Sequence, residues 1–280
     1  MIIDHRNYKD IDYKKYKRVF IFGCSFTRYE WPTWANILAY EMPDAEIYNF
    51  GQSGAGNLFI SERVIAANQR YRYTKDDLIL LMWSTHSRED RYIENGWETP
   101  GNIFTQGFYS EEFVKKYSCV KGYVVRDLAL MTMIKNSLEN FPCDSVMLKS
   151  VEPEYDKKFF MGNAFEEVIE LYRDVIYSMG LPLYHFVHNG KGGWINGHLY
   201  HWPSISYSSY DTPFQDYHPN PAMYMDFLLR SDFMLSSQTQ EKVMKYNEEL
   251  LKLRDRQSIE QWFKKIADSN PKYKHSIHLI

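Results

Sequence analysis

The stretch Val19-Phe20-Ile21-Phe22-Gly23-Cys24-Ser25-Phe26-Thr27 decides the fold of this chain. Four apolar residues run into a glycine, which is typical of a buried strand in a parallel sheet. Ser25 then lies just past the carboxyl end of that strand, where open α/β sheets build their sites. Taken alone, Ser25 is better explained as an ordinary turn residue or helix cap. Whether Ser25 belongs to a functional site therefore depends on the rest of the chain.

Strand and helix patterns alternate along the chain. The apolar runs do not alternate strictly with polar residues, as burial on both faces of a strand predicts. Alternating strands and helices indicate an α/β fold, a three-layer α/β/α sandwich with a mainly parallel central sheet. We expect further strands at 46–50, 77–84, 144–149 and 181–187, and helices at 31–40 with Pro32 in the first turn, 58–72, 122–141, 165–179, 221–229 and 238–266.

The predicted organisation is one main domain with flanking segments. Residues 1–18 form an N-terminal arm, 19–235 the domain, and 236–280 a C-terminal helical tail. Two long insertions, 85–116 and 189–215, are rich in glycine, aromatic and polar residues; loops of this length are usually functional or contain hidden structure. The tail helix either packs on the domain or makes a homo-oligomer contact, and the sequence leaves both open.

Composition restricts the class of protein. The 280 residues carry a net charge of −3, which gives no reason to expect nucleic-acid binding. Three widely spaced cysteines fit a reducing compartment. No signal peptide and no long apolar run is visible, so we expect a cytoplasmic or virion-associated protein without a membrane span. Aromatic residues make up 17% of the chain, which fits either a sugar-binding surface or a compositional habit.

Four polar blocks follow strands or close the sheet. They are Gly23–Thr27, Asn49–Asn57, Trp83–His86 and Asp216–Pro219. Because parallel strands end at one edge of a sheet, these blocks are expected to meet. A serine nucleophile needs a histidine base, a carboxylate that orients the histidine, and amide donors for the oxyanion. The four blocks contain all of these groups.

The order and spacing of the blocks resemble the SGNH hydrolases, also called the GDSL family, whose fold is the SGNH or flavodoxin-like sandwich. GCSFT is similar to the first block of the family, NFGQSGAGN to its glycine block, DLILLMWSTH to the strand before the third block, and DYHP to the late Asp/His block. The resemblance covers residues 19 to about 230. The GCSFT variant is similar to members often found in phage genomes.

The resemblance implies a role for each matching residue. Ser25 is the nucleophile, His218 the general base, and Asp216 the residue that orients His218. The backbone amides of Ser25 and Gly54 stabilise the oxyanion. No cofactor and no metal is implied.

Three departures from the family pattern matter. Cys24 replaces the family's aspartate. Asp216 lies two residues before His218 instead of three, which leaves Asp211 as a second candidate for the orienting carboxylate. His86 falls where the family has asparagine, so either His86 or Asn57 supplies the side-chain oxyanion donor. Asn57 is slightly favoured because an amide NH2 donates at every pH.

Other interpretations of these residues remain open. Asn57 could serve only as a helix cap. Cys24 as the nucleophile is disfavoured because it should point away from the site. Arg88 and Arg91 fit either an anion site or a solvated pair.

The expected substrate contacts are Arg88, Trp83 and Trp194. A metal site among the late histidines is a minor alternative, with its members at His185, His188, His198, His201 and His218.

The function expected from the sequence is that of a serine esterase. It would remove a small O-acyl group, such as acetyl, from a carbohydrate or similar polar substrate through an acyl-serine intermediate. One alternative is an O-acyltransferase that uses the same acyl-serine. The other is a catalytically silent binding or structural protein with the same fold, which the short Asp216–His218 spacing motivates.

Overall fold

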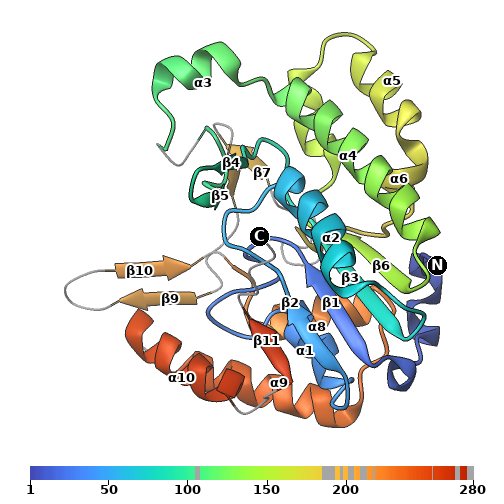
Figure 1. Cartoon of the computed structure of the whole chain (residues 1–280). Coiled ribbons are helices and arrows are strands. Elements are labelled where there is room, and N and C mark those ends of the chain that lie inside the picture. The colour runs from blue at the N-terminus through green and yellow to red at the C-terminus, as the bar shows by residue number, and fades with distance from the viewer. Residues whose placement is uncertain are drawn as a thin grey trace.

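The computed structural model gives the arrangement of most of the chain (Figure 1). The description covers residues 1–104, 108–184, 193–195, 198–200, 205–208, 213–216, 218–253, 255–268 and 272–275, without the side chains of 154–155, 193–216, 268 and 275.

A five-stranded sheet forms the centre of the molecule. Its order is β11-β2-β1-β3-β6, and every neighbouring pair is parallel. β1 and β3 are buried almost throughout, which explains why their sequences are continuous apolar runs. The strands are β1 (Arg18–Phe22), β2 (Glu46–Asn49), β3 (Asp77–Trp83), β6 (Asp144–Lys149) and β11 (Tyr273–His275).

Helices cover both faces of the sheet and complete a three-layer α/β/α sandwich (Figure 1). In one layer, α1 (Trp34–Tyr40), α8 (Pro221–Arg230) and α9 (Ser237–Leu250) contact one another. In the other layer, α2 (Asn57–Tyr71) packs on α4 (Val120–Asn140). The predicted fold class is confirmed.

The remaining elements lie in the insertions and at the ends of the chain. They are α3 (Glu111–Tyr117), α5 (Ala164–Leu171), α6 (Arg173–Tyr177), α10 (Arg256–Asp268), the 3-10 turns η1 (His5–Asp10), η2 (Tyr13–Lys15) and η3 (Pro153–Phe159), and the hairpin strands β4 (Arg91–Ile93), β5 (Gly96–Glu98), β7 (Gly193–Ile195), β8 (His198–Tyr200), β9 (Ile205–Ser208) and β10 (Pro213–Asp216). Among the described residues, no helix has the length and apolar character needed to cross a membrane.

The predicted strand at 181–187 is wrong in its described part. Residues 181–184 are not in a strand, and Leu183 and Tyr184 are helical; 185–187 lie outside the described residues. The fifth strand is instead β11, which comes from the C-terminal tail and pairs with β2. An apolar run of this length does not distinguish a strand from a buried helical turn.

Three predicted helices also differ from the structure. The helix predicted at 165–179 is two helices, α5 and α6, which are separated at Tyr172. The helix predicted at 31–40 begins at Trp34, and Pro32 precedes its N-cap, Thr33. The hydroxyl of Thr33 donates to the carbonyl of Thr27 (2.8 Å), which fixes the start of α1 against the Ser25 turn. The tail contains two helices rather than one: α9 ends at Leu250 and α10 begins at Arg256.

Both flanking segments pack against the sheet. Tyr8 is 1% exposed, and its hydroxyl donates to the carbonyl of Met147 in β6 (2.9 Å). On the tail, Val243 of α9 is fully buried in the main core. The two segments therefore contribute to the same hydrophobic core as the central residues. An oligomer contact through the tail stays a prediction.

Candidate active site

A tight turn after β1 presents Ser25 at the carboxyl edge of the sheet. The amides of Thr27 and Arg28 both donate to the carbonyl of Cys24, at 2.9 and 3.2 Å. A Cβ on Gly23 would lie 2.0 Å from Thr27 Oγ1, so the turn requires glycine there. Cys24 is fully buried in the core, in agreement with its expected direction away from the site.

Ser25 has no hydrogen bond to any described residue. Its side chain is largely buried but keeps some exposure, 6% for the residue. Its backbone amide likewise has no acceptor among the described residues, although the amides of Thr27 and Arg28 in the same turn are occupied. Neither the hydroxyl nor the amide of Ser25 is therefore committed to another described residue.

The glycine block after β2 lies against the Ser25 turn. The amide of Gln52 donates to the carbonyl of Gly23 (3.1 Å), which joins the two segments directly. Gly54 has φ +75°, and a Cβ there would lie 2.0 Å from the carbonyl oxygen of Thr99. Both the backbone conformation and the space demand glycine at this position.

Most amides of the glycine block are occupied, and that of Gly54 is not. The acceptors are Asn49 Oδ1 for Gly51, Gly23 O for Gln52, Gln52 O for Ala55 and Asp90 Oδ1 for Gly56. In the described part of the chain, the amides of Ser53 and Gly54 have no acceptor, like that of Ser25. The two amides that the family resemblance implies for the oxyanion are thus both uncommitted.

His218 lies over the loop that begins at Ser25. Its ring stacks on Tyr29 at 3.7 Å between centroids and lies 5.2 Å from the ring of Phe26. The indole N–H of Trp31 donates to the carbonyl of Pro219 (2.8 Å), which fixes the backbone beside His218. No hydrogen bond between Ser25 and His218 is present among the described residues.

The side chains of three predicted site residues lie outside the described residues. Asp216 is the last residue of β10, which pairs with β9, but its side chain lies outside the described residues. The same holds for the side chain of Trp194 in β7, and Asp211 lies wholly outside them.

A cleft of about 670 Å³ opens between the glycine block and His218. Its walls include Tyr29 from the loop after β1, Gly51 and Gln52 from the glycine block, and His218. Segments far apart in the sequence therefore share one concave surface at the carboxyl edge of the sheet, as the topology of a parallel sheet favours.

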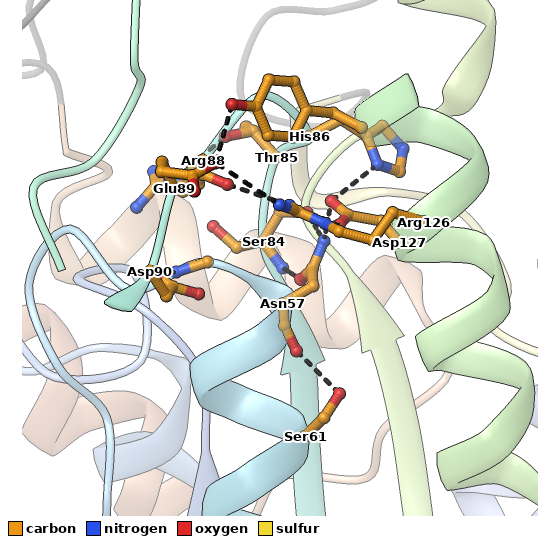
Figure 2. Close-up of polar contacts among 12 residues, drawn as sticks. Asn57, Ser61, Ser84, Thr85, His86, Arg88, Glu89, Asp90, Arg126 and Asp127 are labelled. Carbon is orange, nitrogen blue, oxygen red and sulfur yellow. Dashed lines mark hydrogen bonds and ion pairs between the residues drawn. The ribbon is translucent and has the colours of Figure 1, made fainter. Parts of the chain in front are cut away.

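Asn57 has a structural role in the interior. It is the first residue of α2 and not its cap, which is Gly56. Its Oδ1 accepts from the amide of Ser84 (2.8 Å), and its Nδ2 donates to Asp127 Oδ2 (2.8 Å) and Ser84 O (3.3 Å) (Figure 2). Both N–H groups of the amide are occupied by protein acceptors, which disfavours Asn57 as the oxyanion donor.

His86 also lies in the interior, beside a carboxylate. Its Nδ1 is 3.1 Å from Asp127 Oδ2, and its side chain is 2% exposed (Figure 2). Burial alone lowers the pKa of His86, but the hydrogen bond and charge of Asp127, with the charge of Asp156, raise it above its ordinary value. We therefore assign His86 to a buried pair with Asp127, and its position does not favour contact with a substrate.

Asp127 was missed by the sequence interpretation. It is fully buried, and its Oδ1 also accepts from Arg126 Nε (2.8 Å). The signal was present, because Asp127 stands among the apolar positions of the predicted helix at 122–141, between Val124 and Met131. A carboxylate on the buried face of a helix needs partners.

The start of the first insertion holds the glycine block in place. Arg88 donates to Ala55 O (3.0 Å) and to Thr85 Oγ1 (2.9 Å). Asp90 accepts from the amides of Gly56 (2.8 Å) and Phe59 (2.9 Å), so this carboxylate caps α2 from another segment. Burial raises the pKa of Asp90 to about 6.

The other residues of this region that were predicted to bind a substrate or an anion contact protein groups instead. Trp83 is fully buried, so it has no surface to offer a substrate in this conformation. Arg91 contacts the ring of Phe113 (4.8 Å) and Glu89 (3.2 Å). No group of three or more potential metal ligands occurs among the described residues, and four of the five late histidines have side chains outside them.

Comparisons with known proteins give a distant likeness of fold. No model of a protein family matches the chain, and no curated protein matches it. A lipolytic G-D-S-L family protein from Veillonella parvula DSM 2008 is 15% identical over 77% of this chain and 96% of that one, with a TM-score of 0.36. LAE5, an alpha/beta hydrolase enzyme from the metagenome of Lake Arreo, Spain, is 13% identical over 79% and 97%, with a TM-score of 0.38.

Proposed function

We propose that this chain is a serine esterase whose nucleophile is Ser25. The observation that carries the proposal is the meeting of three distant segments at the carboxyl edge of the sheet: the Ser25 turn, the glycine block and the loop with His218. The amides of Ser25 and Gly54 are uncommitted there, while most of their neighbours are hydrogen-bonded.

In the proposed reaction, Ser25 Oγ attacks the ester carbonyl and His218 takes the hydroxyl proton. The amides of Ser25 and Gly54 donate to the oxyanion. His218 returns the proton to the leaving alcohol, and an acyl-serine remains. Water, activated by His218, then attacks the acyl group and releases the acid. Asp216 is proposed to orient the imidazole, with Asp211 as the second candidate.

The proposed substrate is a small O-acyl ester, such as an acetyl ester, of a carbohydrate or another polar alcohol. The cleft beside His218 supports a polar substrate because glycine, amide and arginine groups share its wall with Tyr29. The aromatic content of the chain supports a sugar less than the sequence alone suggested, because Trp31, Trp34 and Trp83 are all fully buried.

The test is covalent labelling with a fluorophosphonate probe, followed by peptide mass spectrometry. We expect labelling at Ser25, hydrolysis of p-nitrophenyl acetate by the wild type, and loss of both in Ser25→Ala. Ser137→Ala, on α4, is the matched control and should behave like the wild type. If the folded wild-type protein is neither labelled nor active, the esterase proposal is wrong.

One observation favours the second candidate, a catalytically silent binding protein. The structure has no hydrogen bond between Ser25 and His218, which a triad requires in its working state. Catalytic hydrogen bonds are often long without substrate and tighten in the complex, so the labelling experiment decides between the two. The transferase alternative predicts labelling at Ser25 together with acyl transfer to an added alcohol instead of to water.

A further inference from the structure

Arg63 of α2 is a buried cation that faces the same cleft. Its side chain is 7% exposed, and it lies in the cleft wall together with His218. Its Nε donates to Glu62, and its guanidinium lies 5.2 Å from the ring centroid of Phe59. Its Nη2 is buried and has no hydrogen-bond partner among the described residues.

A buried guanidinium N–H without a hydrogen-bond partner destabilises the folded state, because nothing compensates the loss of its hydration. The guanidinium fork matches the geometry of carboxylate and phosphate oxygens. Because Arg63 belongs to the cleft wall, a small rotation of its guanidinium toward the cleft would bring Nη2 to an anionic oxygen bound there, which would supply the missing acceptor.

Two more arginines line this cleft. Arg28 is partly buried, lies close against Gly51, and donates to its carbonyl oxygen (3.3 Å). Arg256 is paired with Glu30, the carboxylate of the cleft wall. With Glu62 beside Arg63 and Glu30 beside Arg256, the three arginines still outnumber the two carboxylates among these described residues, which favours an anion.

We infer that the cleft binds an anionic group, a carboxylate or a phosphate, carried by the substrate ester, and that Arg63 is the residue that recognises it. The statement that the bound anion is part of a substrate rests on the proposed esterase function. The anion site itself depends only on the geometry around Arg63, so it can be tested without turnover.

The first test measures anion binding to the Ser25→Ala variant. This measurement does not depend on catalysis. Inorganic phosphate and succinate are titrated separately by isothermal calorimetry. We expect one site for at least one of the two probes, and at least a tenfold loss of affinity when Arg63→Gln is added. Arg70→Gln, at an exposed position of the same helix, removes the same charge and should leave binding unchanged.

Each outcome of this titration has a defined meaning. Binding of phosphate only assigns a phosphate group, binding of succinate only assigns a carboxylate, and binding of both assigns a general oxyanion site. Failure of both probes, or an equal loss in Arg63→Gln and Arg70→Gln, overturns the inference. If Arg63→Gln does not fold, Arg63→Lys keeps the charge but removes the fork, and should weaken binding.

The second test uses wild-type turnover. Mono-p-nitrophenyl succinate, which carries a carboxylate, is compared with neutral p-nitrophenyl acetate. We expect a higher kcat/KM for the anionic ester, and a ratio that falls at least tenfold in Arg63→Gln through KM. If the protein binds the anions but hydrolyses neither ester, the esterase proposal is wrong and the anion site stands. If it hydrolyses both esters equally and binds neither anion, the esterase proposal stands and the anion site is wrong.

Discussion

At the scale of single residues, Asp127 is a buried carboxylate that is held by three side-chain donors. Its carboxylate is fully buried and accepts from Asn57, His86 and Arg126, which belong to α2, the segment after β3, and α4. A buried carboxylate is tolerated only when it is paired and hydrogen-bonded. The cluster around Asp127 therefore fixes the end of β3 against two helices (Figure 2).

Replacing Asp127 with alanine should lower the free energy of unfolding by about 3–5 kcal/mol, because His86 and Arg126 lose their buried partner. Urea denaturation followed by circular dichroism measures the change. Asp226→Ala breaks an exposed ion pair with Arg230 and should cost about 0–1 kcal/mol. A cost for Asp127→Ala as small as that of the control would contradict the assigned role.

Asp90 predicts a pH dependence of stability. Burial raises its pKa to about 6, above the value of about 3.9 expected when unfolded. The stabilising contribution of the protonated carboxyl is therefore complete below about pH 4 and is lost as the pH rises through about 6.

Asp90→Asn cannot ionise and should lack this dependence. The stability of the wild type relative to Asp90→Asn should thus fall by about 2–3 kcal/mol between pH 4 and pH 7. Chemical denaturation at a series of pH values measures the difference. A constant difference over this range would show that the pKa of Asp90 is not raised.

At the scale of elements, α10 supports the loop that holds His218. Ile259 of α10 and Leu250 at the end of α9 form a small buried cluster with Trp31, and Tyr29 packs against this cluster. Tyr29 in turn stacks on His218. A helix at the C-terminal end of the chain therefore positions a ring that is proposed to act at the carboxyl edge of the sheet.

Ile259→Ala should destabilise the protein by about 2–5 kcal/mol through the cavity it leaves. It should also move the imidazole signals of His218 in NMR spectra, because the neighbouring aromatic rings change position. Ile65→Ala, at an exposed site of α2, serves as the control and should change neither quantity. Unchanged His218 signals in Ile259→Ala would separate α10 from the site.

At the scale of the whole molecule, the C-terminal tail is integral to the sandwich. It supplies α9, which packs on α8 and α1, and β11, which extends the sheet beyond β2 (Figure 1). Tyr273 of β11 accepts from Asn49 Nδ2 (2.8 Å), so the tail also fixes the first residue of the glycine block.

Two truncations test this arrangement. A chain that ends at Leu235 should fail to give a soluble folded protein, because the apolar faces of α1 and α8 lose their cover. A chain that ends at Asp268 should fold with a lower Tm, because only β11 and its surroundings are lost. Size-exclusion chromatography and thermal circular dichroism distinguish the cases, and a stable chain ending at Leu235 would contradict the integral role of the tail.

Local pattern was sufficient for most of the fold. β1 and β3 were predicted because each is a short apolar run, and β2 and β6 because short segments with apolar centres alternate with helical patterns. α2, α4 and α8 were predicted because their apolar residues recur at helical spacing. β11 was not predicted, since Tyr-Lys-His is too short and polar to indicate a strand. Its strand conformation depends on pairing with β2, which is far away in the sequence.

The sequence by itself determined the α/β class and the edge of the sheet at which a site is expected, because burial and chain direction are encoded in short stretches. Only the tertiary structure decided the surroundings of individual polar groups. It paired Asn57 and His86 with Asp127, left the amides of Ser25 and Gly54 uncommitted, and buried Arg63 in a cleft with one nitrogen unpartnered. Hydrogen bonding of buried groups depends on contacts between distant segments, and no local pattern specifies those contacts.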